Sequence, residues 1–209
     1  MSILILGAGA FAREVYDWCI QAGHLVVGFY VTSSTETTLR ALPIFTSLDQ
    51  LSTLDLSSTR WIIGTGNPAI MKILATSLKG AVEPSLPIIH PSCILGSNVI
   101  IGKGSVICPG SILTCDIAIG QSTIVNIGCT IGHDCVVGDY THLSPNTSLS
   151  GFTTIGAECA IGTGVSTVPH VSIDSYSIVG AGASVTKNLP SGLHVGVPAI
   201  TKRLFEEKI

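Results

Sequence analysis

The stretch that decides the fold runs from Val125 to Ile161 and reads VNIGCTIGHDCVVGDYTHLSPNTSLSGFTTIGAECAI. An aliphatic residue recurs at every sixth position, and the spacing continues without insertion in both directions. Leu, Ile or Val fills every position of this series except Thr167. The series is Leu95, Ile101, Ile107, Leu113, Ile119, Val125, Ile131, Val137, Leu143, Leu149, Ile155, Ile161, Thr167, Ile173, Val179 and Val185. A period of six fits neither a helix nor a plain amphipathic strand, whose periods are 3.6 and 2.

The residues around each aliphatic position predict how the repeat folds. Gly often follows it, and a small or β-branched residue usually stands two positions before it. Short strands that each place one large and one small side chain inside, separated by corners that favour a residue without Cβ, explain this pattern. It is the signature of a parallel β-helix. Four cysteines fall on the small inward position, where we expect them in the core: Cys93, Cys129, Cys135 and Cys159.

The first ninety residues have a different organisation. Buried strands are expected at 3–6, 25–31, 61–63 and 86–89, with helices at 13–22 and from Pro68 to about residue 79. Strands that alternate with helices predict a small parallel sheet, with any ligand outside the carboxyl ends of the strands.

The first of these strand ends carries a phosphate-binding motif. The segment from Gly7 to Ala12 matches the dinucleotide fingerprint in form, and a phosphate could rest on the following helix N-terminus. The second strand ends in Tyr30-Val31-Thr32, without the Asp or Glu that holds a ribose hydroxyl in NAD-binding domains. The half-size unit therefore favours one nucleotide, such as the uridine diphosphate of an activated sugar, over NAD.

Composition excludes several classes of protein. Charged residues make up 11% of the 209 residues, the formal net charge is −3, and the mean hydropathy is +0.59. No apolar run reaches the ~18–20 residues of a membrane span, and no cleavable signal segment is visible. The basic residues are scattered, which disfavours nucleic acid. Seven cysteines without a CxxC pair are typical of a reducing compartment, so we expect a cytoplasmic protein.

Three motifs carry a resemblance to a known family: 88–91 (IIHP), 126–142 (NIGCTIGHDCVVGDYTH) and 195–199 (VGVPA). The chain resembles the sialic acid and bacillosamine-type sugar acetyltransferases along nearly its whole length. The resemblance implies a half-Rossmann α/β domain that binds a sugar nucleotide at 1–90. It implies a left-handed β-helix acetyltransferase domain with a C-terminal tail at 91–209. Three hexads per coil would give about five coils, roughly 25 Å long.

Two histidines stand out in the register of the repeat. His133 lies at a corner and His142 immediately precedes an inward Leu, so both side chains are expected to point out of the β-helix. Asp134 follows His133, and a neighbouring carboxylate raises the basicity of an imidazole and holds one tautomer. Acyl transfer to an amine needs such a base, because the amine loses a proton as it attacks the thioester. A solvated surface histidine remains the alternative for both.

The resemblance also implies roles for individual residues. His133 would be the catalytic base and Asp134 its polarising partner. Acetyl-CoA would be the co-substrate, with no metal, and the family's homotrimer would place each site between neighbouring β-helices. The acetyl-CoA contacts would be His142, Thr163 and Ala181. The substrate contacts would be Gly9, Ala10, Phe11, Gly66 and Asn67.

The acceptor side departs from the family pattern. Gly9-Ala10-Phe11 stands where the family usually has Gly-Gly-His or Ser-Gly-His, and Tyr30-Val31-Thr32 stands where it has one or two Asp. We predict N-acetylation of a nucleotide-linked amino sugar.

The sequence leaves several alternatives open. One is O-acetylation of sialic acid or a related sugar, and another is a non-catalytic scaffold that binds a sugar nucleotide. A zinc-dependent carbonic anhydrase shares the repeat only, and its three-histidine site would need a third His in the central coils. A Rossmann-type reductase is disfavoured by the missing acidic residue.

Overall fold

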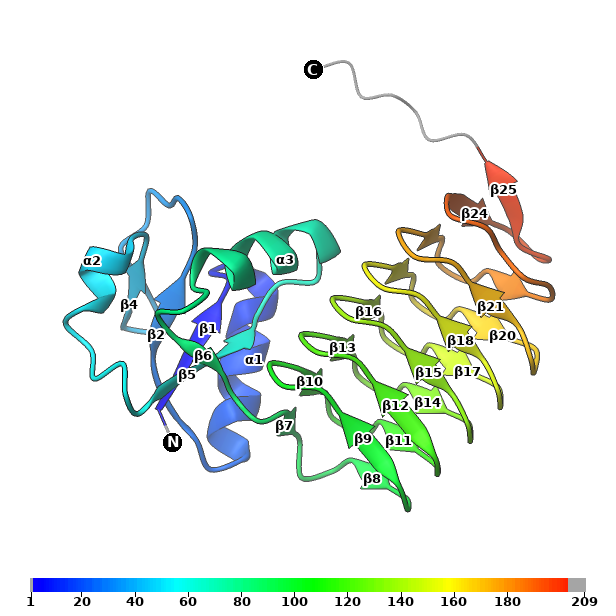
Figure 1. Cartoon of the computed structure of the whole chain (residues 1–209), viewed down its shortest axis with the longest axis horizontal. Coiled ribbons are helices and arrows are strands. Elements are labelled where there is room, and N and C mark those ends of the chain that lie inside the picture. Colours follow the sequence, from blue (N-terminus) through cyan, green and yellow to red (C-terminus); the bar gives the residue numbers. More distant parts are fainter. Residues whose placement is uncertain (1, 203–209) are drawn as a thin grey trace.

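A computed structural model describes residues 2–202, and its first part is a parallel sheet flanked by helices (Figure 1). The sheet order is β3-β4-β2-β1-β5-β6, and only the pair β3–β4 is antiparallel. Its core strand Ile3–Leu6 is fully buried. The strands are β1 (Ser2–Leu6), β2 (Leu25–Tyr30), β3 (Thr38–Leu39), β4 (Leu42–Phe45), β5 (Thr59–Ile63) and β6 (Glu83–Pro84). The helices are α1 (Ala10–Gln21), α2 (Leu48–Leu51) and α3 (Pro68–Ser77).

The expected strand at 86–89 does not belong to this sheet, so that prediction is wrong. Ile88 and Ile89 form β7 (Ile88–Ile89), which pairs with Val106 and Ile107 of the following part of the chain. The run is apolar because Ile88 joins the core of the α/β unit, while Ile89 packs against the interior of the prism.

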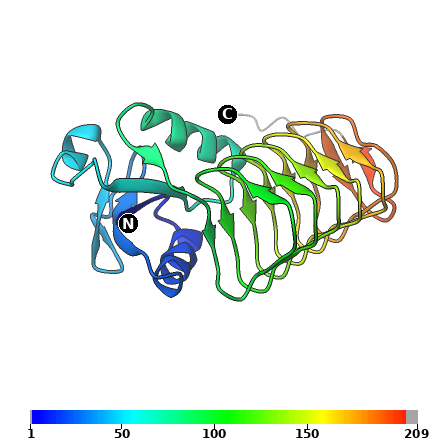
Figure 2. The same ribbon diagram turned by 60° about the horizontal axis from the view of Figure 1, so that its bottom comes forward.

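Between Ile88 and Val185 the chain winds into a three-sided prism of short parallel strands (Figure 2). Within this range each paired strand residue lies eighteen positions from its partner, as Ile107 does from Val125, so three hexads make one coil. The strands are β8 (Ile94–Leu95), β9 (Val99–Ile101), β10 (Val106–Ile107), β11 (Ile112–Leu113), β12 (Ile117–Ile119), β13 (Ile124–Val125), β14 (Thr130–Ile131), β15 (Val136–Val137), β16 (His142–Leu143), β17 (Ser148–Leu149), β18 (Thr154–Ile155), β19 (Ala160–Ile161), β20 (Ser166–Thr167), β21 (Ser172–Ile173), β22 (Ile178–Val179) and β23 (Ser184–Val185).

We name the prism's sides by their strands. Face 1 holds β7, β10, β13, β16, β19 and β22, and it continues into β24 (Leu193–Val195) and β25 (Ile200–Lys202). Face 2 holds β8, β11, β14, β17, β20 and β23, and face 3 holds β9, β12, β15, β18 and β21. Because β7 adds a seventeenth strand to the sixteen hexads, the prism has nearly six coils where about five were predicted.

From Ile107 on, the aliphatic positions fill the prism as predicted, whereas near the open end Leu95 is 38% exposed and Ile101 is half-buried. From Ile107 to Val185 every member of the series is buried, Thr167 included. Cys129, Cys135 and Cys159 are fully buried on the small inward position, and Cys93 is half-buried near the open end. Burial raises the pKa of the Cys129 thiol to about 11, which makes it an unreactive core residue.

The glycines that follow the aliphatic residues serve close packing between coils. Their backbone is not left-handed; instead, a Cβ would strike the backbone of the next coil, as at Gly138, where it would lie 2.5 Å from the Ala157 nitrogen. The left-handed residue stands two positions further on, at every sixth residue from Asn98 to Gly182. Each hexad thus turns at a position that favours Gly, Asn or Asp.

The α/β unit covers the first coils of face 1. Val106 and Ile124 point out of the prism there, yet both are fully buried because they join the core of the α/β unit. Trp61 packs against Gly104, where a Cβ would lie 2.7 Å from the indole. Lys72 of α3 forms a 2.7 Å ion pair with Glu158. The two units are therefore joined by both apolar packing and charge.

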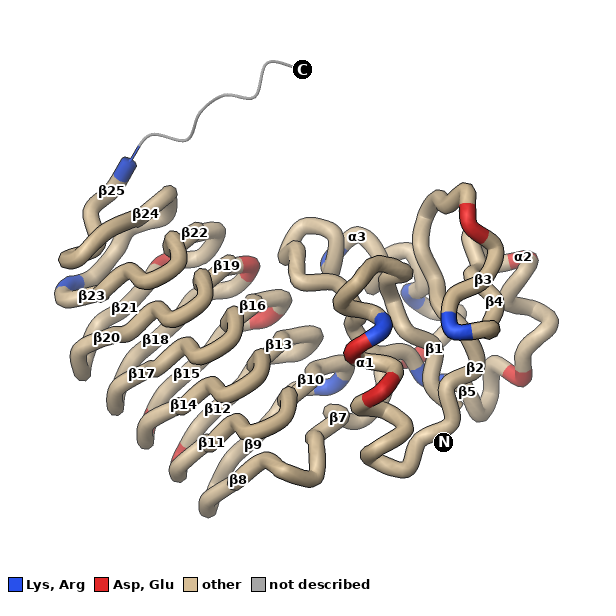
Figure 3. The backbone as a smooth tube through the Cα atoms, turned by 180° about the vertical axis from the view of Figure 1, so that it is seen from behind, with Lys and Arg blue, Asp and Glu red and all other residues tan. Residues whose placement is uncertain are grey.

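Few charges line the prism (Figure 3). Across 95–190 they are Lys103, Asp116, Asp134, Asp139, Glu158, Asp174 and Lys187. In the described range 2–202 no helix has the length and apolar character needed to cross a membrane.

The close approach of the coils predicts a sharp contrast between two glycines. Gly138→Ala should lower the free energy of unfolding by about 2–3 kcal/mol, because its Cβ would meet backbone that cannot move aside. Gly110→Asn should change it by less than about 0.5 kcal/mol, because Gly110 is left-handed with open space around it and Asn tolerates that conformation. Urea unfolding of both variants tests this, and equal losses would contradict it.

Candidate functional site

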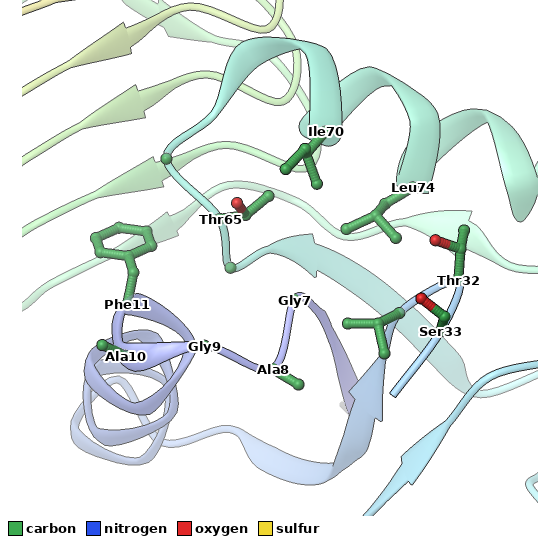
Figure 4. A pocket seen from close by; sticks show the side chains of 13 residues that line it. Gly7, Ala8, Gly9, Ala10, Phe11, Thr32, Ser33, Thr65, Ile70 and Leu74 are labelled. Atoms are coloured by element: carbon green, nitrogen blue, oxygen red, sulfur yellow. The ribbon is translucent and has the colours of Figure 1, made fainter. Parts of the chain in front are cut away.

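A cavity of about 380 Å³ opens where β1, β2 and β5 end and α1 and α3 begin (Figure 4). This is the place predicted for a ligand, outside the carboxyl ends of parallel strands. Among residues 2–202, no Asp, Glu, Lys or Arg lines it. Its lining is Gly7, Ala8, Gly9, Ala10, Phe11, Val31, Thr32, Ser33, Gly64, Thr65, Gly66, Ile70 and Leu74.

The glycine-rich loop brings backbone N–H groups to this cavity. Gly7 has a φ of +133°, and a Cβ there would lie 2.5 Å from the Gly64 carbonyl oxygen, so only Gly allows the tight turn from β1 into α1. Gly9 is the N-cap of α1, and within the described chain no side chain caps it and no acidic residue stands in the first turn. The cavity is therefore neutral in its side chains, with a helix N-terminus that attracts an anion.

Four of the five predicted substrate contacts meet in this cavity. Gly9, Ala10, Phe11 and Gly66 line it, as Figure 4 shows for the α1 residues. Asn67 does not line it: its side-chain oxygen accepts a 3.2 Å hydrogen bond from the Ile70 amide and caps α3. Thr32, Ser33 and Thr65, which sequence reasoning did not select, supply the hydroxyl groups.

His142 joins the cavity to the β-helix. Its Nδ1 lies 2.8 Å from the Gly66 carbonyl oxygen, and because that oxygen only accepts, Nδ1 carries the proton. Its Nε2 accepts from the Asn126 side-chain amide at 3.1 Å, and the Phe11 ring lies beside it. Burial lowers the pKa of His142, so the ring is held neutral. It points out of the prism as predicted, but the surface-histidine alternative is wrong for it.

Asn126 was missed as a functional candidate. It stands directly after Val125, in the position where the repeat most often has Gly, and it is buried. Its side-chain oxygen accepts from the Ile127 amide at 2.7 Å, which aims the NH₂ group at His142. An Asn in a place that favours Gly was the signal available in the sequence.

His133 and Asp134 form the predicted pair. His133 Nδ1 lies 2.8 Å from the Asp134 carboxylate, so Nδ1 donates and the Nε2 lone pair is left for a proton. Both side chains are about half exposed, at 54% and 43%. Asp134 is also the left-handed residue of its hexad, with a φ of +60°. The His133 imidazole is thus hydrogen-bonded through Nδ1 and half exposed. Its unprotonated nitrogen, Nε2, lies on the side of the ring away from Asp134.

Thr163 and Ala181 lie one above the other on the edge between faces 1 and 2. The Thr163 carbonyl accepts from the Gly182 amide in the next coil at 2.8 Å, and both residues are exposed. His142, on face 1, lies one coil before Thr163 and two coils before Ala181. These three predicted acetyl-CoA contacts therefore share one side of the prism.

The pair His133–Asp134 lies elsewhere. It occupies the turn between β14 on face 2 and β15 on face 3, and in a three-sided prism this edge is opposite face 1. The α/β unit with its cavity covers face 1. Within one chain the structure does not bring His133 together with the cavity.

Among the side chains of 2–202, no cluster of three or more His, Cys, Asp or Glu has the arrangement of a metal site.

Comparisons with known proteins show which proteins share this sequence pattern and fold. Residues 2–78 match the family described as the PglD N-terminal domain. Over the whole chain the structure is similar to the acetyltransferase domain of PglB from Neisseria gonorrhoeae in complex with acetyl coenzyme A, with a TM-score of 0.88 and 25% identity over 96% of this chain and 98% of that one. No curated protein sequence matches the chain.

Two further structures extend the likeness. One is a histidine-to-asparagine variant of perosamine N-acetyltransferase from Caulobacter crescentus in complex with CoA and GDP-perosamine, with a TM-score of 0.88 and 28% identity over 97% of both chains. The other is WeeI from Acinetobacter baumannii, with a TM-score of 0.86 and 31% identity over 96% of this chain and 99% of that one.

The fold and the site define an acyltransferase built on a left-handed β-helix. With 31% identity along almost its full length, the chain belongs to the sugar acetyltransferases of the sialic acid and bacillosamine type.

The position of His142 predicts that stability falls in mild acid. Its pKa is lowered in the folded state, so the unfolded chain binds a proton more readily, and stability is lost as pH falls below the ordinary value near 6.5. A protonated Nε2–H would also face the Asn126 NH₂ group. The midpoint of thermal unfolding should drop more steeply between pH 7.5 and 5 in wild type than in His142→Gln. Parallel curves would contradict this.

Proposed function

We propose that the protein transfers the acetyl group of acetyl-CoA to the amino group of a nucleotide-linked sugar. The observation that carries the proposal is the 2.8 Å hydrogen bond from His133 Nδ1 to Asp134, which leaves Nε2 as an accessible base. The perosamine N-acetyltransferase bound to CoA and GDP-perosamine supports this class of substrate. The PglB domain bound to acetyl coenzyme A supports the acetyl donor.

The reaction follows from the chemistry of these groups. The sugar amine attacks the thioester carbonyl, and His133 Nε2 takes the proton that the nitrogen must lose. The C–S bond of the tetrahedral intermediate then breaks, and the imidazolium returns the proton to the departing sulfur. The products are the acetamido sugar and CoA thiol. Asp134 stabilises the imidazolium between the two steps and keeps the tautomer that exposes Nε2.

The nucleotide of the acceptor would occupy the cavity beside α1. The diphosphate fits the uncapped N-terminus at Gly9, because backbone N–H groups and the helix dipole both favour an anion there. The hydroxyls of Thr32, Ser33 and Thr65 are available to the nucleoside. The nucleoside would thus be recognised by neutral hydroxyl groups. The family pattern instead has one or two Asp at the end of the second strand.

Acetyl-CoA would run along face 1 and its edge with face 2, past His142, Thr163 and Ala181. Both ring nitrogens of His142 are already hydrogen-bonded to Gly66 and Asn126, so this side chain would contact the cofactor through its ring carbons. Thr163 and Ala181 would act through their backbone.

A second copy of the chain would complete each site. The cavity lies on face 1 and His133 on the opposite edge, so His133 from a neighbouring β-helix has to approach the cavity. A closed ring of three chains satisfies this requirement for every copy at once. We propose three chains because that is the number the family resemblance implies.

Substitutions at the pair test the chemistry. His133→Ala should reduce kcat by roughly 10²–10⁴-fold, the contribution of a general base. Asp134→Asn should reduce it by roughly tenfold, because Asn keeps the left-handed turn but loses the charge that stabilises the imidazolium. Activity is measured as free thiol released from acetyl-CoA with a panel of nucleotide-linked amino sugars.

The matched control is Asp116→Asn. Asp116 is also left-handed, on the same edge one coil earlier, but it is preceded by Cys115 rather than a histidine. It should retain wild-type turnover. If His133→Ala turned over normally, the assigned base would be wrong.

Mixed assemblies test where the site lies. His133→Ala removes the base, and Ala10→Trp fills the nucleotide cavity from an exposed position. Co-expressed in equal amounts, the two inactive variants should regain about a quarter of the wild-type sites if cavity and base come from different copies. Sites contained within one chain would give no recovery. Light scattering of the same samples measures the number of chains.

A further inference from the structure

Phe152 adopts a backbone conformation that its side chain disfavours. Its φ is +60°, in the left-handed region. Gly, Asn and Asp adopt this region at little energetic cost, whereas a bulky residue there is an outlier. The preceding residues at this place on the same edge are Asn98, Asp116 and Asp134, all of which suit it. The Phe152 side chain is 46% exposed, so burial does not account for the choice of residue.

The contacts of the Phe152 ring point to His133. The two rings meet edge to face, with centroids 5.2 Å apart and planes at 88°. On its other side the Phe152 ring stacks on His170 of the next coil, at 4.5 Å and 9°. Three aromatic rings on one exposed edge thus form a continuous series that ends at the candidate base.

Gly151 makes room for this arrangement. A Cβ there would lie 2.7 Å from both Cε1 and Nε2 of His133, so the imidazole rests directly over the Gly151 backbone. His133 is therefore surrounded on three sides: Asp134 bonds Nδ1, Gly151 lies under the ring, and Phe152 packs on it.

We propose that Phe152, held by His170, is a positioning residue for the His133 base; this rests on the proposed function. A half-exposed histidine samples several side-chain rotamers, and a half-turn of its ring about Cβ–Cγ puts Cδ2 in the place of Nδ1 and Cε1 in the place of Nε2, which breaks the hydrogen bond to Asp134. The Phe152 ring blocks that rotation and keeps Nδ1 on Asp134, so Nε2 stays directed outward.

The variant Phe152→Asn separates conformational strain from function. Asn suits the left-handed backbone, as Asn98 and Asn146 do in other hexads, so the thermal midpoint should rise. It lacks the ring, so kcat should fall by roughly tenfold while KM for both substrates changes less than twofold. Phe152→Tyr keeps the ring and should retain most of the activity.

Tyr176→Asn is the matched control. Tyr176 is left-handed as well, with a φ of +65°, is 63% exposed, and lies on a different edge from His133. The same relief of strain should raise its thermal midpoint and leave kcat unchanged. A fall in kcat in both Asn variants would overturn the proposal, because it would show that relieving strain anywhere on the prism reduces turnover.

A second measurement does not depend on turnover. With ¹⁵N-labelled histidine, the His133 ring nitrogens should report one tautomer, with the proton on Nδ1, in wild type and an averaged pair of tautomers in Phe152→Asn. Unchanged His133 signals would overturn the proposal. So would a loss of kcat that accompanies dissociation of the assembly in light scattering, which would make Phe152 a contact between copies. The two proposals can fail separately. If wild type acetylated no nucleotide-linked amino sugar, the proposed function would be wrong. The ¹⁵N signals of His133 would still test whether Phe152 positions its ring.

Discussion

The pairing of each residue with the residue eighteen positions later is the constraint on which the rest of the molecule depends. It stacks identical hexad positions directly over one another, so one choice of residue type is repeated along a whole column. The backbones come so close at the residue after each aliphatic that a Cβ at Gly138 would strike Ala157. It also forces a left-handed turn at every sixth residue. A side chain's face and exposure follow from its place in the hexad.

The candidate site uses positions that the pairing leaves outside. Asp134 has a plain structural reason to be an Asp, because Asp116 occupies the same left-handed place one coil earlier. Its additional role comes from the residue before it: Asp116 follows a cysteine, whereas Asp134 follows His133 and bonds its Nδ1. The coil above supplies Gly151 and Phe152 at the matching places. A repeated framework thus becomes a specific site through a few substitutions within one column.

Most of the prism could be predicted from the sequence because its contacts are periodic. The aliphatic series, the inward cysteines and the outward direction of His133 and His142 all follow from counting by six, and the structure confirms them from Ile107 on. The environment of His142 could not be predicted in this way. It depends on which face the α/β unit covers, and that is fixed by contacts between distant segments, such as Val106 and Ile124 with the core of that unit. Asn67 followed the family pattern but caps α3, a local role that spacing alone does not distinguish.

The remaining apolar surface fits the proposed assembly. Ile100 on face 3 is 71% exposed, and Ile112 on face 2 and Val136 on face 3 are 37% and 44% exposed. These faces adjoin the edge that carries His133, and few charges interrupt them (Figure 3). Large exposed aliphatic residues are costly in water and favour burial against another protein surface. Contact between copies through this edge would shelter the apolar side chains and bring His133 to a neighbour's cavity, so the proposed assembly would serve both the exposed apolar surface and the proposed site.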